Sequence, residues 1–221
     1  MDSVYLPDWT LSSFTRSMIG RMDTRRAVLD AALAMVADGG PDGVSMREVA
    51  RRAGVSHQAP YHHFTDRSGI FAAITAEGFD LLASRFEGAL VGDERPARRC
   101  FEAYLRTALE YPGHFRIMFR ADLCGVTSHD VARSAADAAY GRLQELVERT
   151  IGAATDRRTA AAWSSMMWSS AHGFATLLLD GPLALKLDPS VPLNAHIGDV
   201  VDLMSEMVER QAAAMGLGAG R

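Results

Sequence analysis

The sequence predicts an all-α protein in which a three-helix head is followed by a body of about six helices. Apolar residues recur at three- and four-residue steps through most of the chain after Thr24, which is the period of one helix face. Beyond Asp66 the sequence holds no run of alternating, β-branched residues bounded by turns, as a strand would require. The composition, 48% hydrophobic and 23% charged over 221 residues, is typical of a folded globular chain.

The first helix is expected to begin at Thr24. Val28, Ala32 and Val36 follow it at four-residue steps, so their side chains share one face of a helix. The helix should end at Asp38-Gly39-Gly40-Pro41, because glycine and proline stop helices.

A capping box predicts the start of the second helix. In Ser45-Met46-Arg47-Glu48 the Ser45 hydroxyl can accept from the Glu48 amide, while the Glu48 carboxylate accepts from the Ser45 amide. Gly54 then supplies a left-handed residue that ends this short helix.

Ser56 can cap the third helix, whose expected first turn is His57-Gln58-Ala59-Pro60. Proline is tolerated there because few intrahelical amide bonds are lost near a helix start. The helix continues into Tyr61-His62-His63-Phe64. Two short helices joined by Gly54-Val55-Ser56 form a helix-turn-helix arrangement.

The chain is expected to consist of three segments. Residues 1–20 show no sustained period, and we expect a flexible leader there. We assign residues 21–67 to the helix-turn-helix head and residues 68–221 to the body. Within the body we expect helices near 67–90, 97–111, 113–122, 129–153, 157–179 and 195–215, and one long loop at 180–193.

The stretch from Thr24 to Arg67 resembles the DNA-binding region of TetR-family transcriptional regulators. The resemblance rests on the ordered strings Ser45 to Ala50, Ala53 to Ser56 and Tyr61 to Phe64, with Arg67 where the family usually has lysine. The sequence departs from the family at Ala59, often threonine or a small polar residue, and at Pro60, often leucine.

The body is similar to one C-terminal type of that family, in the string Pro112 to Phe119 and in Trp168-Ser169-Ser170-Ala171-His172-Gly173. The resemblance implies a homodimer in which each head reads half of a pseudo-palindromic operator in double-stranded DNA and each body holds a small-molecule effector. Repression that ends when the effector binds is the behaviour it implies. The alternative is a helical module that binds a ligand or a protein without binding an operator.

Ten residues of the head are candidates for DNA contact. A recognition helix enters the major groove with its first residues near base edges, while flanking groups hold phosphates. Gln58 can contact adenine, and His57 can donate to guanine or, equally, to a phosphate. The helix starts after Thr24 and Ser45 can bind phosphates through their amides. The full set is Thr24, Ser45, Arg47, Ser56, His57, Gln58, Tyr61, His62, His63 and Arg67.

Aromatic and sulfur-containing side chains concentrate in the body, where a helical bundle can enclose a largely apolar effector. His172 lies four residues after Trp168, so the two side chains share a helix face. His172 can equally be a hydrogen-bonded core histidine, and for any one residue of the set core packing is favoured over ligand contact. The candidates are Tyr104, Phe115, Met118, Phe119, Trp163, Met167, Trp168 and His172.

The last helix carries an apolar stripe formed by Ile197, Val200, Val201, Met204, Met207 and Val208. The resemblance implies that 157–179 and 195–215 form the contact between two subunits. Packing of the stripe within one subunit remains open.

The sequence also argues against other classes of protein. No apolar run reaches the roughly 18 residues of a membrane span, and the N-terminal charges do not fit a secretory signal, so we expect a cytoplasmic protein. No metal-ligand spacing, nucleophile elbow or phosphate-binding glycine loop occurs. We therefore expect no metal, no cofactor and no enzymatic activity.

Overall fold

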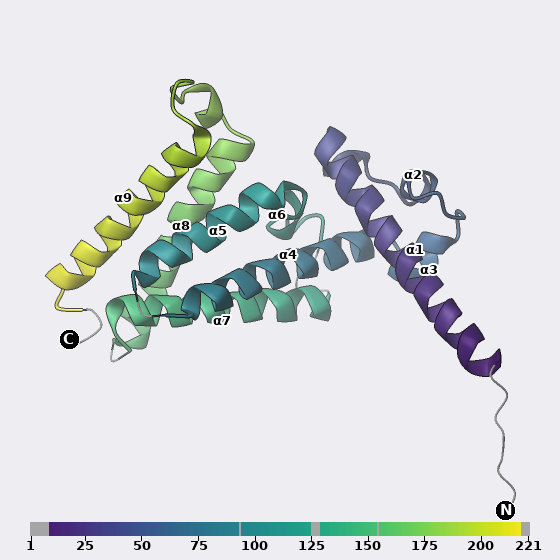
Figure 1. Ribbon diagram of the computed structural model, residues 1–221, viewed down its shortest axis with the longest axis horizontal. Coiled ribbons are helices and arrows are strands. Elements are labelled where there is room, and N and C mark those ends of the chain that lie inside the picture. Colours follow the sequence, from purple (N-terminus) through teal and green to yellow (C-terminus); the bar gives the residue numbers. More distant parts are fainter. Residues whose placement is uncertain (1–8, 93, 125–128, 154, 218–221) are drawn as a thin grey trace, which may run out of the picture.

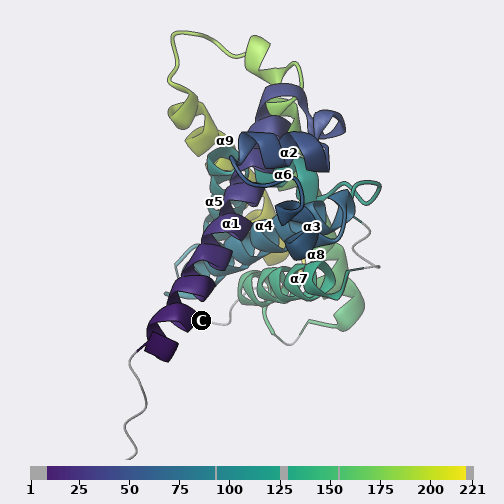
Figure 2. The ribbon, with the colours of Figure 1, turned by 90° about the vertical axis from the view of Figure 1, so that its right-hand side faces the viewer.

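The computed structural model describes residues 9–92, 94–124, 129–153 and 155–217, and these ranges hold helices and no strands. The head consists of α1 (Trp9–Gly39), the short helix η1 (Pro41–Gly43), α2 (Met46–Arg52) and α3 (Ala59–Phe64). In Figure 1 the head lies at one end of the body, and Figure 2 looks onto that end, with α2 and α3 toward the viewer. The described residues thus confirm the predicted all-α class.

The body contains the six predicted helices and one further short helix. They are α4 (Arg67–Leu90), α5 (Pro96–Glu110), α6 (Pro112–Met118), α7 (Asp130–Ile151), α8 (Arg157–Leu179), η2 (Leu183–Leu185) and α9 (Leu193–Ala214). The predicted loop at 180–193 includes η2. None of the described helices is both long and apolar enough to cross a membrane.

The boundaries of α1 and α6 differ from the predictions. α1 begins at Trp9, well before Thr24, so the helix includes much of the segment for which we expected a leader; residues 1–8 lie outside the described residues. A formed helix extends at little cost without an apolar stripe, so periodicity did not reveal this extension. α6 ends at Met118 rather than near 122, because the chain turns at Arg120 and buries Cys124 in the core of the head.

The start of α2 follows the predicted cap in part. The Ser45 hydroxyl accepts a hydrogen bond from the Glu48 amide at 3.3 Å, and Gly54 ends the turn with a φ of 66°. The Glu48 carboxylate accepts from Arg51 and Arg52 instead of the Ser45 amide. One half of the capping box is therefore formed, because two charged donors on the next turn bind the carboxylate.

The start of α3 corrects the prediction for Ser56. The helix begins at Ala59, with His57 and Gln58 in the preceding turn, so Gln58 and not Ser56 is the residue before the helix. The Ser56 carbonyl accepts from the Ala59 amide instead. Pro60 explains the late start, because proline has no amide hydrogen and is accommodated in the first turn of a helix.

A tight turn joins α3 to α4. Thr65 has φ 61° and ψ −55°, and the Asp66 amide donates to the Phe64 carbonyl across it. The Asp66 carboxylate caps α4 by accepting from the Gly69 amide at 2.9 Å. A Cβ atom at Gly69 would overlap the Phe64 carbonyl oxygen. Only glycine fits at position 69 while the two helices keep this close approach.

α4 connects two separate cores. Its first half contributes Ile70, Phe71 and Ile74 to the core of the head, whereas its second half contributes Phe79 and Phe86 to the core of the body. Because one continuous helix belongs to both cores, a change in how the body packs against α4 can reach the head.

Candidate DNA interface and effector cavity

The surface of α2, α3 and the turn between them presents most of the predicted DNA contacts. The ones that are exposed are Ser45, Arg47, Ser56, His57, Gln58, Tyr61 and His62. The His57 and Tyr61 ring centroids lie 5.8 Å apart. Two side chains that can donate hydrogen bonds to DNA therefore lie side by side at the leading end of α3.

The arginines of α2 are not equivalent. Arg51 and Arg52 form ion pairs with the Glu48 carboxylate, and Arg52 also pairs with Asp38 at 2.6 Å. The hydrogen bond from Arg51, followed by that from Arg52, lowers the pKa of Glu48 to about 2. Arg47 has no ion pair within the described ranges. It is thus the α2 arginine whose charge is available to a phosphate.

The other three predicted contacts, Thr24, His63 and Arg67, are half-buried. Arg67 donates to the Pro41 carbonyl at 2.6 Å, and its guanidinium lies 4.9 Å from the centroid of the Phe71 ring. These contacts tie the start of α4 to η1. Arg67 thus stabilises the helix arrangement and is not free to contact a phosphate in this conformation.

A hydrogen-bonded aromatic cluster lies in the body. The Tyr104 hydroxyl accepts from the Trp168 indole N–H at 3.2 Å and lies 2.9 Å from His172 Nδ1. Because the indole can only donate, the hydroxyl proton is left for Nδ1, and His172 carries its own hydrogen on Nε2. Burial raises the pKa of the Tyr104 hydroxyl, which therefore stays protonated. The Phe115 and Phe119 rings contact the His172 ring, with centroids 5.3 and 4.6 Å away.

A small apolar cavity of about 20 Å³ adjoins this cluster. Helices α4, α5, α7 and α8 line it, through Phe79, Leu82, Phe86, Tyr104, Ala136, Ala139, Tyr140, Leu143 and Trp168. A space of this size holds about one water molecule. An effector that enters this cavity would therefore have to displace some of the side chains that line it.

The predicted effector residues lie in several different parts of the body. Tyr104 and Trp168 line the apolar cavity, whereas Phe115, Phe119 and His172 border a groove of about 540 Å³ between the end of α1 and the helices α6 and α8. Met118 packs against Gly78, and Met167 is buried in the core. Trp163 lies apart from the cavity, in a groove between α8 and α9.

The α8–α9 face is apolar and open. A groove of about 650 Å³ there is lined by residues that include Phe101, Trp163, Met204 and Met207. The predicted stripe of α9 divides: Val201 and Val208 are buried in the body core, whereas Met207 is 64% exposed. Exposed Leu177, Met166 and Leu203 extend the apolar surface on the two helices.

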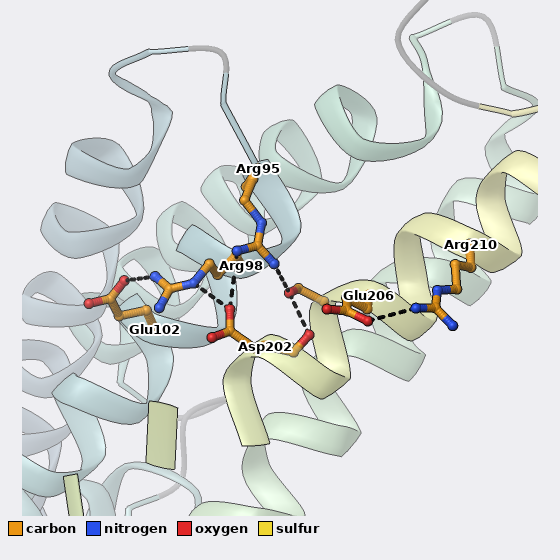
Figure 3. A network of polar contacts seen from close by, with 7 residues as sticks. Arg95, Arg98, Glu102, Asp202, Glu206 and Arg210 are labelled. Atoms are coloured by element: carbon orange, nitrogen blue, oxygen red, sulfur yellow. Dashed lines mark hydrogen bonds and ion pairs between the residues drawn. The ribbon is translucent and has the colours of Figure 1, made fainter. Parts of the chain in front are cut away.

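Ion pairs fix the position of α9 on α5 (Figure 3). The Asp202 carboxylate accepts from Arg98 at 2.7 Å and from Arg95 at 3.1 Å, and Arg95 also donates to the Ser205 hydroxyl. The hydrogen bond from Arg98 lowers the pKa of Asp202. This polar network thus holds α9, which carries part of the open apolar face, against α5.

Sequence reasoning missed several residues that matter to these sites. Phe79 and Tyr140 line the cavity, and Arg26, Glu77 and His114 meet where the head joins the body. Helical periodicity identifies apolar faces, but it does not reveal which helix each face will contact. The ion pair of Arg26 with Glu77 joins residues 51 positions apart and carries no local sequence signal.

Burial of His172 predicts a pH dependence of stability. Desolvation lowers the pKa of His172 below its ordinary value, and the proton received from Tyr104 at Nδ1 further favours the neutral ring. As the pH falls below about 6.5, the unfolded chain binds a proton at this histidine before the folded chain does. The free energy of unfolding is therefore expected to fall between pH 7 and pH 5, and to fall less in His172→Asn.

Urea unfolding at one protein concentration across this pH range measures the difference between the two proteins. Asparagine keeps an acceptor for the Tyr104 hydroxyl but does not titrate. Parallel profiles for wild type and variant would contradict the assignment. Keeping above pH 5 avoids the carboxylates whose pKa is lowered, such as Asp66 and Asp202.

Two family models match the chain. The one described as "Bacterial regulatory proteins, tetR family" matches residues 28–74, and the one described as "Tetracyclin repressor-like, C-terminal domain" matches residues 97–211. The second match covers more than half of the 221 residues.

Curated relatives match a shorter part of the chain. An uncharacterized HTH-type transcriptional regulator of Mycobacterium tuberculosis (strain ATCC 25618 / H37Rv) is 41% identical over 78 residues, which are 35% of this chain and 40% of that protein. The HTH-type transcriptional repressor KstR of Rhodococcus jostii is 33% identical over 76 residues, which are 34% of this chain and 36% of that protein. The chain therefore matches less than half the length of these relatives.

Solved structures match over most of the chain. A protein of unknown function from Rhodococcus sp. RHA1 has a TM-score of 0.65 at 26% identity, and the match covers 89% of this chain and 96% of that one. The TetR family transcriptional regulator PfmR from Thermus thermophilus has a TM-score of 0.62 at 20% identity, with 88% and 99% covered. At 20% identity the likeness shows the fold.

Proposed function

Because this chain belongs to the TetR family of bacterial regulatory proteins, we propose that it is a ligand-responsive, DNA-binding transcriptional regulator. Specifically, we propose a homodimeric repressor that leaves its operator when a small molecule binds. The observation that carries this proposal is the exposed helix-turn-helix surface, on which Arg47 lies with His57, Gln58 and Tyr61. We place the protein in the cytoplasm and assign it no catalytic residues.

In this proposal α3 enters the major groove of DNA. Gln58 reads a base edge, and His57 contacts a base or a phosphate. The remaining exposed contacts, Ser45, Arg47, Ser56, Tyr61 and His62, bind or face the DNA backbone. Thr24 and His63 support the backbone contacts from the rim, and Arg67 acts by holding α4 against η1.

The proposed effector site is the apolar cavity with the adjoining aromatic cluster. The Tyr104 hydroxyl and the Trp168 N–H are already hydrogen-bonded within the cluster, so the cavity offers mainly apolar walls. We therefore propose a largely apolar effector that opens the bundle by displacing aromatic side chains. Phe115, Phe119 and His172 border this site, Met118 and Met167 support it from the core, and Trp163 belongs to the subunit interface.

The proposed dimer forms through α8 and α9, whose exposed apolar face a single subunit leaves uncovered. A two-fold axis through this face would present two heads to the two halves of a pseudo-palindromic operator. An effector that binds the operator-bound and free conformations with different affinity would then release the DNA.

Selection of DNA sequences by the purified protein tests the proposal. We expect an enriched palindrome with half-sites about 10 base pairs or a multiple apart, bound more weakly as the salt concentration rises. Tyr61→Ala should weaken binding about 10-fold, since it removes a hydrogen bond to a charged phosphate. Gln144→Ala, at an exposed position on α7 in the body, serves as the control and should bind like wild type.

The opposite result has a clear meaning. If selection enriches no sequence and Tyr61→Ala binds DNA as wild type does, the head does not read an operator. The protein would then be a helical module that binds a ligand or a protein through its body.

A further inference from the structure

Helix α6 is seated between the head and the body with no spare room. A Cβ atom at Gly113 would lie 3.2 Å from Leu33 Cδ2 of α1, and a Cβ atom at Gly78 of α4 would lie 3.2 Å from the Cβ of His114. Both distances are shorter than ordinary carbon contacts. α6 therefore contacts α1 on one side and α4 on the other, and it cannot shift without affecting one of them.

Glu77 of α4 lies where these three helices meet. Its Oε1 atom accepts from Arg26 of α1 at 2.5 Å. Its Oε2 atom lies 3.4 Å from His114 Nε2 of α6. These last two atoms are buried, and neither has a hydrogen-bond partner within the described residues. A buried polar atom without a partner is rare and costly, so a pair of them facing one another requires an explanation.

Another side of α6 faces the proposed effector site. Phe115 directly follows His114, and its ring centroid lies 6.1 Å from that of Tyr104 and 5.3 Å from that of His172. A side chain displaced in the aromatic cluster would therefore move the helix that carries His114. A small shift of α6 would bring His114 Nε2 and Glu77 Oε2, now 3.4 Å apart, to the ordinary hydrogen-bond distance of about 2.9 Å.

We propose that Glu77 is the positioning residue through which the body sets the orientation of the head, with Arg26 as its contact on the head and His114 as its contact on α6. The proposal rests on the proposed function. We take the conformation with the nearly filled cavity as the one that binds the operator. The ion pair of Arg26 with Glu77 then stabilises the operator-binding orientation, and the open contact between His114 and Glu77 reports the position of α6.

Spin labels at Ala34→Cys on α1 and Gln144→Cys on α7 test this inference, because both positions are exposed and the two native cysteines are buried. Labelled protein is mixed with excess unlabelled protein, so that the measured distance lies within one subunit. We expect one narrow distance distribution in the wild-type background. Glu77→Gln, which keeps the shape of the side chain but removes its charge, should broaden the distribution and weaken binding of the selected operator about 5-fold.

Arg26→Gln removes the contact with Glu77 from the more exposed side of the pair, together with the pair that Arg26 forms with Asp30 inside α1. It provides an answer even if Glu77→Gln does not fold. Arg26→Gln should also broaden the distance distribution and weaken operator binding. The double variant Glu77→Gln with Arg26→Gln should bind the operator no more than twofold more weakly than either single variant. Arg26→Lys should bind more tightly than Arg26→Gln, because it restores the positive charge. Glu102→Gln is the matched control: Glu102 pairs with Arg98 and Arg106 within α5, and its side chain is 34% exposed against 33% for Glu77.

Two results would overturn the inference. One is a distance distribution in Glu77→Gln and Arg26→Gln that equals the wild-type distribution. The other is an equal broadening in Glu102→Gln, since any loss of an ion pair would then have the same effect. A wild-type protein that selects no operator would contradict the proposed function instead, and the distance measurement would still decide the role of Glu77.

Discussion

Replacing Met207 with aspartate is expected to convert the protein to monomers and to weaken operator binding at least about 100-fold. Met207 lines the apolar groove of the α8–α9 face and is 64% exposed in one subunit. In the proposed dimer its side chain would be buried, and an unpaired carboxylate buried there costs several kcal/mol. The single subunit should fold normally, because an exposed substitution changes stability by only about 0.5 kcal/mol.

The loss of affinity follows from the two-fold arrangement. A dimer binds its second half-site as an intramolecular step, whereas a monomer has only one half-site to hold. Sedimentation equilibrium and operator titration would measure the two effects on the same samples.

Val131→Asp provides the matched control for this variant. Val131 is 61% exposed and lies in the first turn of α7, in a groove that residues of α1 and α4 also line. The Val131→Asp protein should remain dimeric. A Met207→Asp protein that stays dimeric, or a monomer that binds the operator as tightly as wild type, would contradict the proposed interface.

Local signals made much of the head predictable from the sequence. Ser45, Gly54 and Pro60 act on the backbone within a few residues of themselves, so their effects can be judged without knowing the tertiary structure. The late start of α3 also has a local cause, in Pro60. The early start of α1 has no such signal, because helix extension needs neither a cap nor an apolar face.

The effector site was less predictable for a geometric reason. Trp163 and Trp168 both lie on α8, but they lie on different faces of it, and the structure places one at the groove beside α9 and the other at the cavity. The helical period identifies both as apolar positions. The period does not reveal which neighbouring helix each tryptophan will contact, since that depends on how α5, α7 and α9 pack. The junction at Glu77 is likewise set by tertiary packing.

Replacing Tyr104 with phenylalanine is expected to lower the free energy of unfolding by about 2–4 kcal/mol. The substitution removes one oxygen atom from a side chain that is 4% exposed. That oxygen accepts from Trp168 Nε1 and donates to His172 Nδ1. Both partners would lose their hydrogen bond beside a cavity whose lining is mostly apolar, at about 1–3 kcal/mol for each unsatisfied group. The melting temperature should fall by roughly 5–10 °C.

Tyr140→Phe is the control that separates the hydroxyl from the ring. Tyr140 also lines the cavity, and its ring centroid lies 6.0 Å from that of Trp168, but its hydroxyl has no hydrogen bond within the described residues. Its removal should change the free energy of unfolding by less than about 0.5 kcal/mol. Equally small losses in the two variants would show that ring packing, and not the Tyr104 hydroxyl, stabilises the aromatic cluster. A larger loss in Tyr104→Phe would instead show that the two hydrogen bonds of this hydroxyl hold Trp168 and His172 in place.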